Sequence, residues 1–210
     1  MKIGIFGGTF DPPHIGHINA CKAFLEQVDL DVLYIMPVYL PPHKNIFSGT
    51  SVNSRLDMAK IAFSPLSSKV LVSDLEIRRE GKSYTADTIK QLKNDIENAE
   101  IFFLCGTDMI LTMDFWYKPE YIFSNATIVY VRREDDENIT NEIDKKCLLY
   151  KEKYCANIIS IKTKAIDISS SEIRSDLLNC ESGLTPEIYD YITKNNLYEN
   201  IRKWTMIGNL

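Results

Sequence analysis

Short apolar runs alternate along the chain with stretches whose apolar residues recur at helical spacing. Six runs are nearly continuous in apolar residues and end at glycine, proline or polar residues, which predicts strands buried on both faces. They span residues 2–6, 31–36, 69–77, 100–106, 126–133 and 157–161.

The stretches between these runs predict helices, because their apolar residues lie three or four positions apart. The predicted helices span residues 16–28, 53–63, 84–96, 138–154, 169–178 and 185–196. In the second, we expect Leu56, Ala59, Ala62 and Phe63 to share the buried face and Lys60 to point to solvent.

Three of these helices begin with capping residues. Thr85 is the expected N-cap of the third helix. Ser169 and Glu172 have the spacing of a capping box, and Thr185 precedes a proline at a first helical position.

This alternation predicts an α/β fold. We expect a Rossmann-like, doubly wound, mainly parallel sheet with helices on both faces and a small C-terminal helical part. We expect one domain over residues 1–198, and we assign no role to the tail 199–210. In such a sheet ligands bind at the carboxyl ends of the strands, where the strand order reverses. The runs 2–6 and 100–106 both lead into glycine-containing loops at that edge.

Composition narrows the classes of function. The 210 residues are 45% hydrophobic and 25% charged, and no apolar run reaches the roughly 18 residues that a membrane helix needs. The apolar start is too short for a signal peptide, so we expect a cytoplasmic protein with no membrane partner. A net charge of −5 argues against a broad nucleic-acid surface. Five cysteines without a C-x-x-C pair are expected to be reduced thiols, and the oligomeric state, a homo-oligomer included, is left open.

The loop after the first run, "GGTFDPPHIGH", is suited to binding an anion. Gly7 and Gly8 let the backbone approach a ligand, and the following helix points its free N–H groups at the same space. His14 and His17 lie three residues apart on one helix face and can both donate to one phosphate. The bland alternatives are two zinc ligands without a third partner, and an Asp11 that only stabilises the loop. The glycine patterns of dinucleotide-binding and Walker loops are absent.

The same letters resemble the G-[ST]-F-D-P-x-H-x-G-H signature of the nucleotidyltransferase superfamily with the H-x-G-H motif. The literal "HIGH" also resembles class I aminoacyl-tRNA synthetases. Those enzymes add a K-M-S-K-S-type loop, which this chain lacks, and it is too short and too acidic for their role.

Later stretches resemble one branch of this superfamily, the bacterial nicotinate-nucleotide adenylyltransferases. The resemblance covers residues 1–198 in the family's order. It rests on "PPHK", "EIRREGKSYTADTI", "FFLCGTDMILTMDFWYKPEYIF", "ISSSEIR" and "LTPEIYDYITKNNLY". Two positions depart from the family pattern: Ser171 stands for threonine and keeps a hydroxyl, and Cys105 stands for an aliphatic residue.

The resemblance implies adenylyl transfer from ATP to nicotinate mononucleotide, giving the dinucleotide and pyrophosphate in NAD biosynthesis. The mononucleotide phosphate would attack the α-phosphorus directly, with no protein nucleophile, and Mg²⁺ would arrive with ATP. Catalysis would then be positioning and stabilisation of charge.

The resemblance also implies roles for individual residues. His14, His17 and Arg174 would be catalytic donors to the triphosphate. ATP would also contact Gly7, Gly8, Thr9, Phe10, Gly106, Asp108, Ile168, Ser169, Ser170 and Ser171. The mononucleotide would contact Lys44, Thr85 and Trp116, with a weaker case for Arg132 or Arg133. None of these residues is expected to bind a metal directly.

Two other hypotheses remain. A phosphopantetheine adenylyltransferase or cytidylyltransferase would share the first loop but lack "SYTADT" and the G-x-D…W segment. A nucleotide-binding sensor without activity would have lost a histidine or the S-x-x-x-R pattern, and both are present here.

Overall fold

The computed structural model describes residues 1–42, 50–132, 137–163, 166 and 168–198. In it, six strands form one sheet in the order β3-β2-β1-β4-β5-β6. All pairs of neighbouring strands are parallel. The strands are β1 (Lys2–Gly8), β2 (Val32–Pro37), β3 (Val70–Val72), β4 (Glu100–Cys105), β5 (Ala126–Arg132) and β6 (Ile158–Lys162). The predicted doubly wound α/β fold is confirmed.

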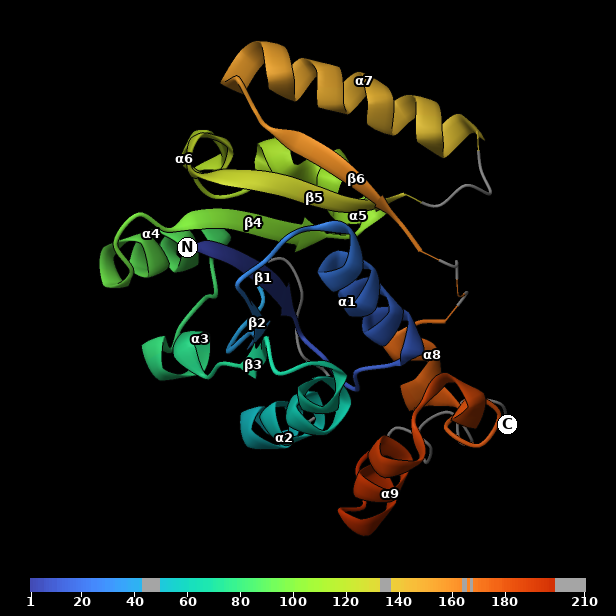
Figure 1. Ribbon diagram of the computed structural model, residues 1–210. Coiled ribbons are helices and arrows are strands. Elements are labelled where there is room, and N and C mark those ends of the chain that lie inside the picture. Colours follow the sequence, from blue (N-terminus) through green and yellow to red (C-terminus); the bar gives the residue numbers. More distant parts are fainter. Residues whose placement is uncertain (43–49, 133–136, 164–165, 167, 199–210) are drawn as a thin grey trace.

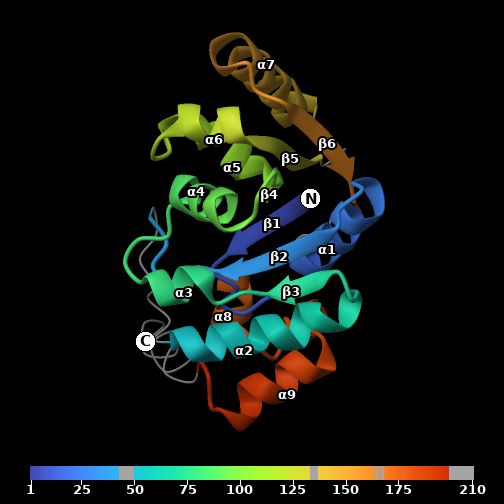
Figure 2. The ribbon, with the colours of Figure 1, turned by 60° about the vertical axis from the view of Figure 1, so that its left-hand side comes forward.

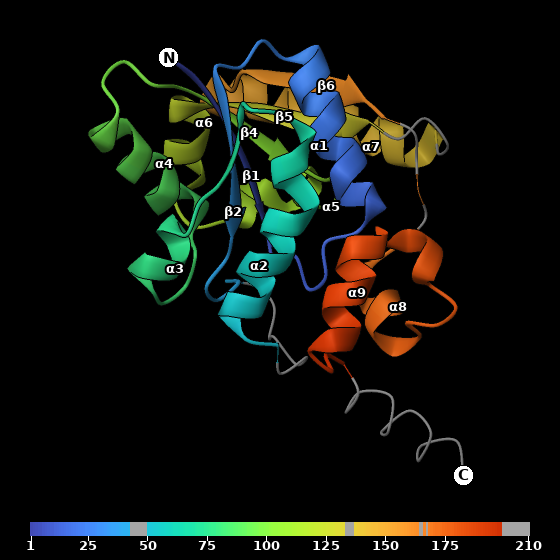
Figure 3. The same cartoon turned by 60° about the horizontal axis from the view of Figure 1, so that its bottom comes forward.

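Helices cover both faces of the sheet (Figure 1, Figure 2). One face packs against α1 (Ile15–Gln27), α2 (Val52–Phe63), α8 (Ser170–Ser175) and α9 (Pro186–Lys194). The other packs against α3 (Leu75–Arg79), α4 (Thr85–Asp95), α5 (Thr107–Thr112), α6 (Pro119–Asn125) and α7 (Glu137–Tyr154). Figure 3 shows the C-terminal helices α8 and α9 side by side.

Two hydrophobic clusters, one on each face, hold the layers together. On β2, Leu33 and Ile35 are fully buried toward α1 and α2, whereas Val32 and Met36 belong to the cluster that includes α4. Each fully buried aliphatic side chain contributes about 1.5–3 kcal/mol relative to an exposed one. Burial on both faces explains why the strands read as continuous apolar runs.

Several expectations need correction. The third predicted strand ends at Val72, and α3 occupies the second half of the run 69–77. The N-cap of α4 is Tyr84, and Thr85 is its first helical residue, because the Tyr84 carbonyl accepts the N–H of Thr88. Leu56 is only half-buried.

The other capping signals are borne out. Ser169 and Glu172 form the capping box of α8. The Thr185 side chain caps α9, with Pro186 as the first helical residue. Within the described ranges, no helix has both the length and the apolar character that crossing a membrane requires.

Candidate active site

A large cavity opens at the carboxyl ends of β1 and β4, the two central strands. From β1 the chain proceeds to β2 and β3 on one side, and from β4 to β5 and β6 on the other. The cavity has a volume of about 1350 Å³. It therefore lies at the switch point where ligands bind in doubly wound folds.

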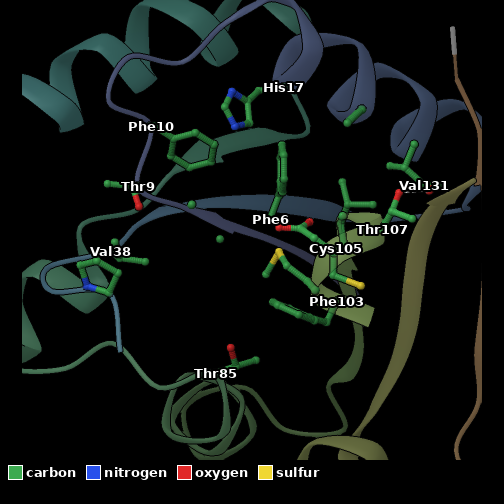
Figure 4. A pocket seen from close by; sticks show the side chains of 18 of the residues that line it. Phe6, Thr9, Phe10, His17, Val38, Thr85, Phe103, Cys105, Thr107 and Val131 are labelled. Atoms are coloured by element: carbon green, nitrogen blue, oxygen red, sulfur yellow. Dashed lines mark hydrogen bonds between the residues drawn. The ribbon is translucent and has the colours of Figure 1, made fainter. Parts of the chain in front are cut away.

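The structure brings the predicted site residues together around this cavity. Its lining includes Gly7, Gly8, Thr9, Phe10, His14, His17, Thr85, Gly106, Asp108, Trp116, Ile168, Ser169, Ser170, Ser171 and Arg174. Lys44, Arg133 and the side chain of Arg132 lie outside the described residues. In Figure 4, His17 and Phe10 are on one side of the cavity, and Thr85, at the start of α4, lies across from them.

The two histidines form a compact pair at the start of α1. Their ring centroids are 3.7 Å apart, and the backbone N–H of His14 donates to Nδ1 of His17 at 3.3 Å. That bond assigns the proton of a neutral His17 to Nε2. His14 Nδ1 is buried and has no hydrogen-bond partner within the described residues. Buried polar atoms usually have partners, so this nitrogen is available to a ligand.

Both histidines are neutral in the free protein at neutral pH. Burial lowers the pKa of His14 to about 4, against a smaller opposing effect of Glu172. Burial, and then the neighbouring His14, holds the pKa of His17 well below its usual value of 6.5. A bound triphosphate would supply the negative charge that favours their protonated forms.

The low pKa of His14 predicts that acid destabilises the free protein. Between pH 6.5 and pH 4 the unfolded chain binds a proton at this residue and the folded chain does not, so stability falls as the pH falls. The loss approaches about 3 kcal/mol, at roughly 1.4 kcal/mol per pKa unit. Urea unfolding of the wild type and of His14→Asn, between pH 7 and pH 4, measures it.

Asparagine suits the comparison because it is also a good N-cap residue. Protonation of carboxylates destabilises both proteins alike, so the difference between the two curves reports His14. We expect the wild type to lose more stability than His14→Asn over this interval. Parallel curves would contradict the assigned pKa.

The glycine of the H-x-G-H motif makes room for the histidine pair. A Cβ atom on Gly16 would lie 3.0 Å from two atoms of the His14 ring, so a side chain there would push the ring away. Phe10 supports the pair from below, with its ring 5.3 Å from that of His17 in an edge-on contact. Phe10 is 1% exposed, so its ring belongs to the core and what it can offer a ligand is its backbone.

Helix α8 docks onto the first loop through polar side chains. Ser170 Oγ donates to the Pro12 carbonyl at 2.9 Å. Arg174 donates to the Asp11 carbonyl at 2.7 Å and to Ser171 Oγ at 3.2 Å. The predicted C-terminal contact residues therefore build the wall of the cavity beside the histidines.

The opposite wall combines the start of α4 with the segment after α5. The Tyr84 side chain does not cap α4, and Thr85 lines the cavity at this helix start. Trp116 follows the 3₁₀ turn Met113–Phe115 and contacts Phe103 edge-on, with centroids 6.1 Å apart. The rings of Tyr84 and Tyr117 lie 4.5 Å apart and join the two parts of this wall.

Sequence reasoning missed two buried charged residues near the site. Glu76 of α3 lines the cavity, accepts the Thr88 hydroxyl at 2.6 Å and has a pKa raised by burial. Arg55 of α2 is 0% exposed and donates to the carbonyls of Thr9, Val38 and Tyr39. Charged residues rarely lie in a core, so no pattern of apolar positions finds them.

The described residues contain no group of three His, Cys, Asp or Glu side chains that could hold a metal ion. The site's chemistry is thus that of hydrogen-bond donors: two imidazoles, an arginine, serine hydroxyls and helix N-terminal amides. Donors of this kind suit phosphate groups.

Comparisons with known proteins agree with this arrangement. A family model described as cytidylyltransferase-like matches residues 5–176. A probable nicotinate-nucleotide adenylyltransferase of Borreliella afzelii is 36% identical over 203 residues, covering 94% of this chain and 97% of that protein. One of Clostridium perfringens is 34% identical over 200 residues, covering 94% and 98%.

A solved structure shares the fold. The nicotinic acid mononucleotide adenylyltransferase of Plasmodium falciparum, complexed with NaAD, superposes with a TM-score of 0.73 at 24% identity. The match covers 94% of this chain and 97% of that one. With a family model that covers most of its length and relatives above 30% identity over nearly all of it, the chain belongs to the cytidylyltransferase-like family and, within it, to the nicotinate-nucleotide adenylyltransferases.

Proposed function

We propose that this protein joins ATP and nicotinate mononucleotide to give nicotinate adenine dinucleotide and pyrophosphate, a step of NAD biosynthesis. A phosphate oxygen of the mononucleotide attacks the α-phosphorus of ATP in line. The bond from that phosphorus to the β-phosphate oxygen breaks, and pyrophosphate leaves with the electron pair. We place the reaction in the cytoplasm, where ATP is available.

One observation carries this proposal. All the residues that the family resemblance assigns to ATP or to the mononucleotide, apart from Lys44, line a single cavity at the switch point of the sheet. These residues come from distant parts of the chain, and only the fold unites them. At about 1350 Å³, the cavity is larger than most small-molecule sites, which suits two nucleotides.

The chain's own groups would act by positioning and by stabilising charge. His14 and His17 would donate to the triphosphate from the start of α1, and Arg174 would add a permanent positive charge beside them. Arg174 has five N–H donors, of which two printed bonds hold it to the loop and to Ser171, so donors remain for phosphate. Such donors act most strongly in a site from which water is excluded.

The nicotinate end would lie at the opposite wall. The first amides of α4 face the cavity beside Thr85 without a side-chain cap, and such amides favour a carboxylate. Trp116 would stack on the pyridine ring. Asp108, at the exposed start of α5, would bind ribose hydroxyls.

We expect Mg²⁺ to enter with ATP. The absence of a carboxylate cluster in the described residues fits this role, because Mg²⁺ keeps several waters and binds substrate phosphates. The ion would neutralise phosphate charge, and the residues above would hold the nucleotides around it.

The purified protein, given ATP, Mg²⁺ and nicotinate mononucleotide, is expected to release pyrophosphate and dinucleotide in equal amounts. Chromatography of the dinucleotide and a coupled assay for pyrophosphate measure both. Pyrophosphate release no faster than in the absence of mononucleotide would refute the proposal.

Nicotinamide mononucleotide provides the matched comparison, because it replaces the carboxylate with an amide. We expect kcat/KM to be at least about tenfold higher for the acid, since a hydrogen bond to a charged group is stronger by ~1 kcal/mol or more. Equal values for the two substrates would remove the α4 amides from base selection.

A further inference from the structure

The C-terminal end of the described chain reaches the first loop. Tyr198 is 4% exposed, and its hydroxyl donates to Oδ1 of Asp11 at 2.9 Å. Asp11 is 3% exposed and lies in the loop between β1 and the histidine pair. The two residues are 187 positions apart, so this contact closes nearly the whole chain.

The backbone takes an unusual path to deliver this tyrosine. After α9 ends at Lys194, Asn196 and Tyr198 have positive φ angles of 51° and 68°. For a bulky side chain such a conformation is uncommon and costs roughly 1–2 kcal/mol. A strained residue persists only where its surroundings hold it, and here the buried ring and the bond to Asp11 do so.

Asp11 is the one residue of the first loop whose side chain and carbonyl are both held. Arg174 binds its carbonyl, and Tyr198 binds its side chain. The neighbouring carbonyls of Thr9 and Pro12 are held by Arg55 and by Ser170. The loop that leads into His14 is therefore fixed from three sides, and the side chain of Asp11 is fixed by the C-terminal segment.

The tyrosine does not itself reach the ligand space. Asp11 is among the residues that line the cavity, and Tyr198 is absent from that lining, within the described residues. The Tyr198 hydroxyl is also 3.9 Å from the sulfur of Met58, which places it in the layer beneath the loop. Burial and the facing Asp11 raise its pKa, so it remains a neutral donor.

We propose that Tyr198 is a positioning residue for the transfer reaction, holding Asp11 so that the loop presents His14 and His17 to the triphosphate. This role rests on the proposed function for its kinetic consequence. Its structural consequence, the placement of the histidine rings, does not depend on any substrate.

The chain offers a matched control. Tyr191, in α9, also donates its hydroxyl to a carboxylate, Oδ2 of Asp57 in α2, at 3.2 Å. Tyr191→Phe therefore removes the same kind of bond from the same C-terminal segment, but away from the first loop. Tyr198→Phe and Tyr191→Phe each delete one hydroxyl and keep the ring.

Steady-state kinetics separates positioning from simple attachment of the C-terminal segment. We expect Tyr198→Phe to lower kcat about tenfold, because misplacement of catalytic groups by an ångström can cost up to ~hundredfold. KM for both nucleotides should change less than about twofold, and Tyr191→Phe should keep the wild-type kcat. Equal kcat values for Tyr198→Phe and wild type, or equal losses in the two variants, would overturn the proposal.

Histidine NMR decides the question even if the wild type shows no turnover. The chain has only three histidines, so their imidazole signals can be assigned. We expect Tyr198→Phe to shift the signals of His14 and His17 in the free protein, and Tyr191→Phe to leave them in place. Unshifted signals in Tyr198→Phe would overturn the positioning role, whereas absent turnover of the wild type would refute only the proposed reaction.

Discussion

Replacing His17 with asparagine is expected to lower kcat by about 10²–10³-fold while the protein stays folded. Loss of one donor that stabilises developing charge typically costs ~2.7–4 kcal/mol of barrier. The asparagine Oδ1 can still accept the N–H of His14, which the Nδ1 atom of His17 accepts at 3.3 Å. The substitution therefore removes the Nε2 donor and keeps the start of α1 intact.

Two further variants sharpen this test. Glutamine at position 17 places an amide nitrogen near the lost Nε2, so His17→Gln should retain more activity than His17→Asn. Lys22→Ala changes an exposed residue of the same helix and should behave as wild type. The measurement is kcat at saturating nucleotides, with circular dichroism to check folding. A His17→Asn enzyme within about threefold of wild type would exclude this donor role.

Replacing Arg55 with methionine is expected to lower the free energy of unfolding by about 3–5 kcal/mol, as for other broken buried charge pairs. Arg55 is fully buried and donates to the carbonyls of Thr9, Val38 and Tyr39 at 3.0, 2.7 and 3.1 Å. It also faces the buried Asp11, whose negative charge it offsets. Methionine fills similar space but leaves these groups without their cation.

Urea denaturation measures this loss, with Arg78→Met as the control. Arg78 also lies on a helix and pairs with a carboxylate, that of Asp74 at 2.9 Å, but its side chain is 71% exposed. Exposed pairs contribute at most about 1 kcal/mol, so Arg78→Met should be nearly as stable as wild type. Arg55→Lys keeps the charge but not the three-way bond, and should fall between them. Equal stabilities of Arg55→Met and Arg78→Met would refute the clamp.

The apolar pattern predicted all six strands and the longer helices because both are defined by side chains that must be buried. It missed α3, α5 and α6, which have only five, six and seven residues. Helices this short contain too few turns to show a period. A local signal existed for α6, since Pro119 is its first helical residue.

The same contrast holds at the site. Gly8, His14 and Arg174 were predicted because they belong to compact motifs with a recognisable spacing. Arg55 and Tyr198 were not, since each acts on backbone or side-chain atoms of a loop that lies far away in the sequence. The burial of Arg55 is stable only because three carbonyls converge on it, and such convergence is a property of the folded chain.

The connections to the first loop also bear on how the protein is made. The loop is among the first segments to leave the ribosome, yet its holds from Ser170, Arg174 and Tyr198 span 158, 163 and 187 residues. Contacts over such distances form late, after the intervening chain has closed. A nascent chain can thus pair β1 with β2 early, but its nucleotide loop remains unfinished until the last helix has been synthesised. Nucleotide capture should therefore begin only once translation is nearly complete, which keeps partial chains from sequestering ATP.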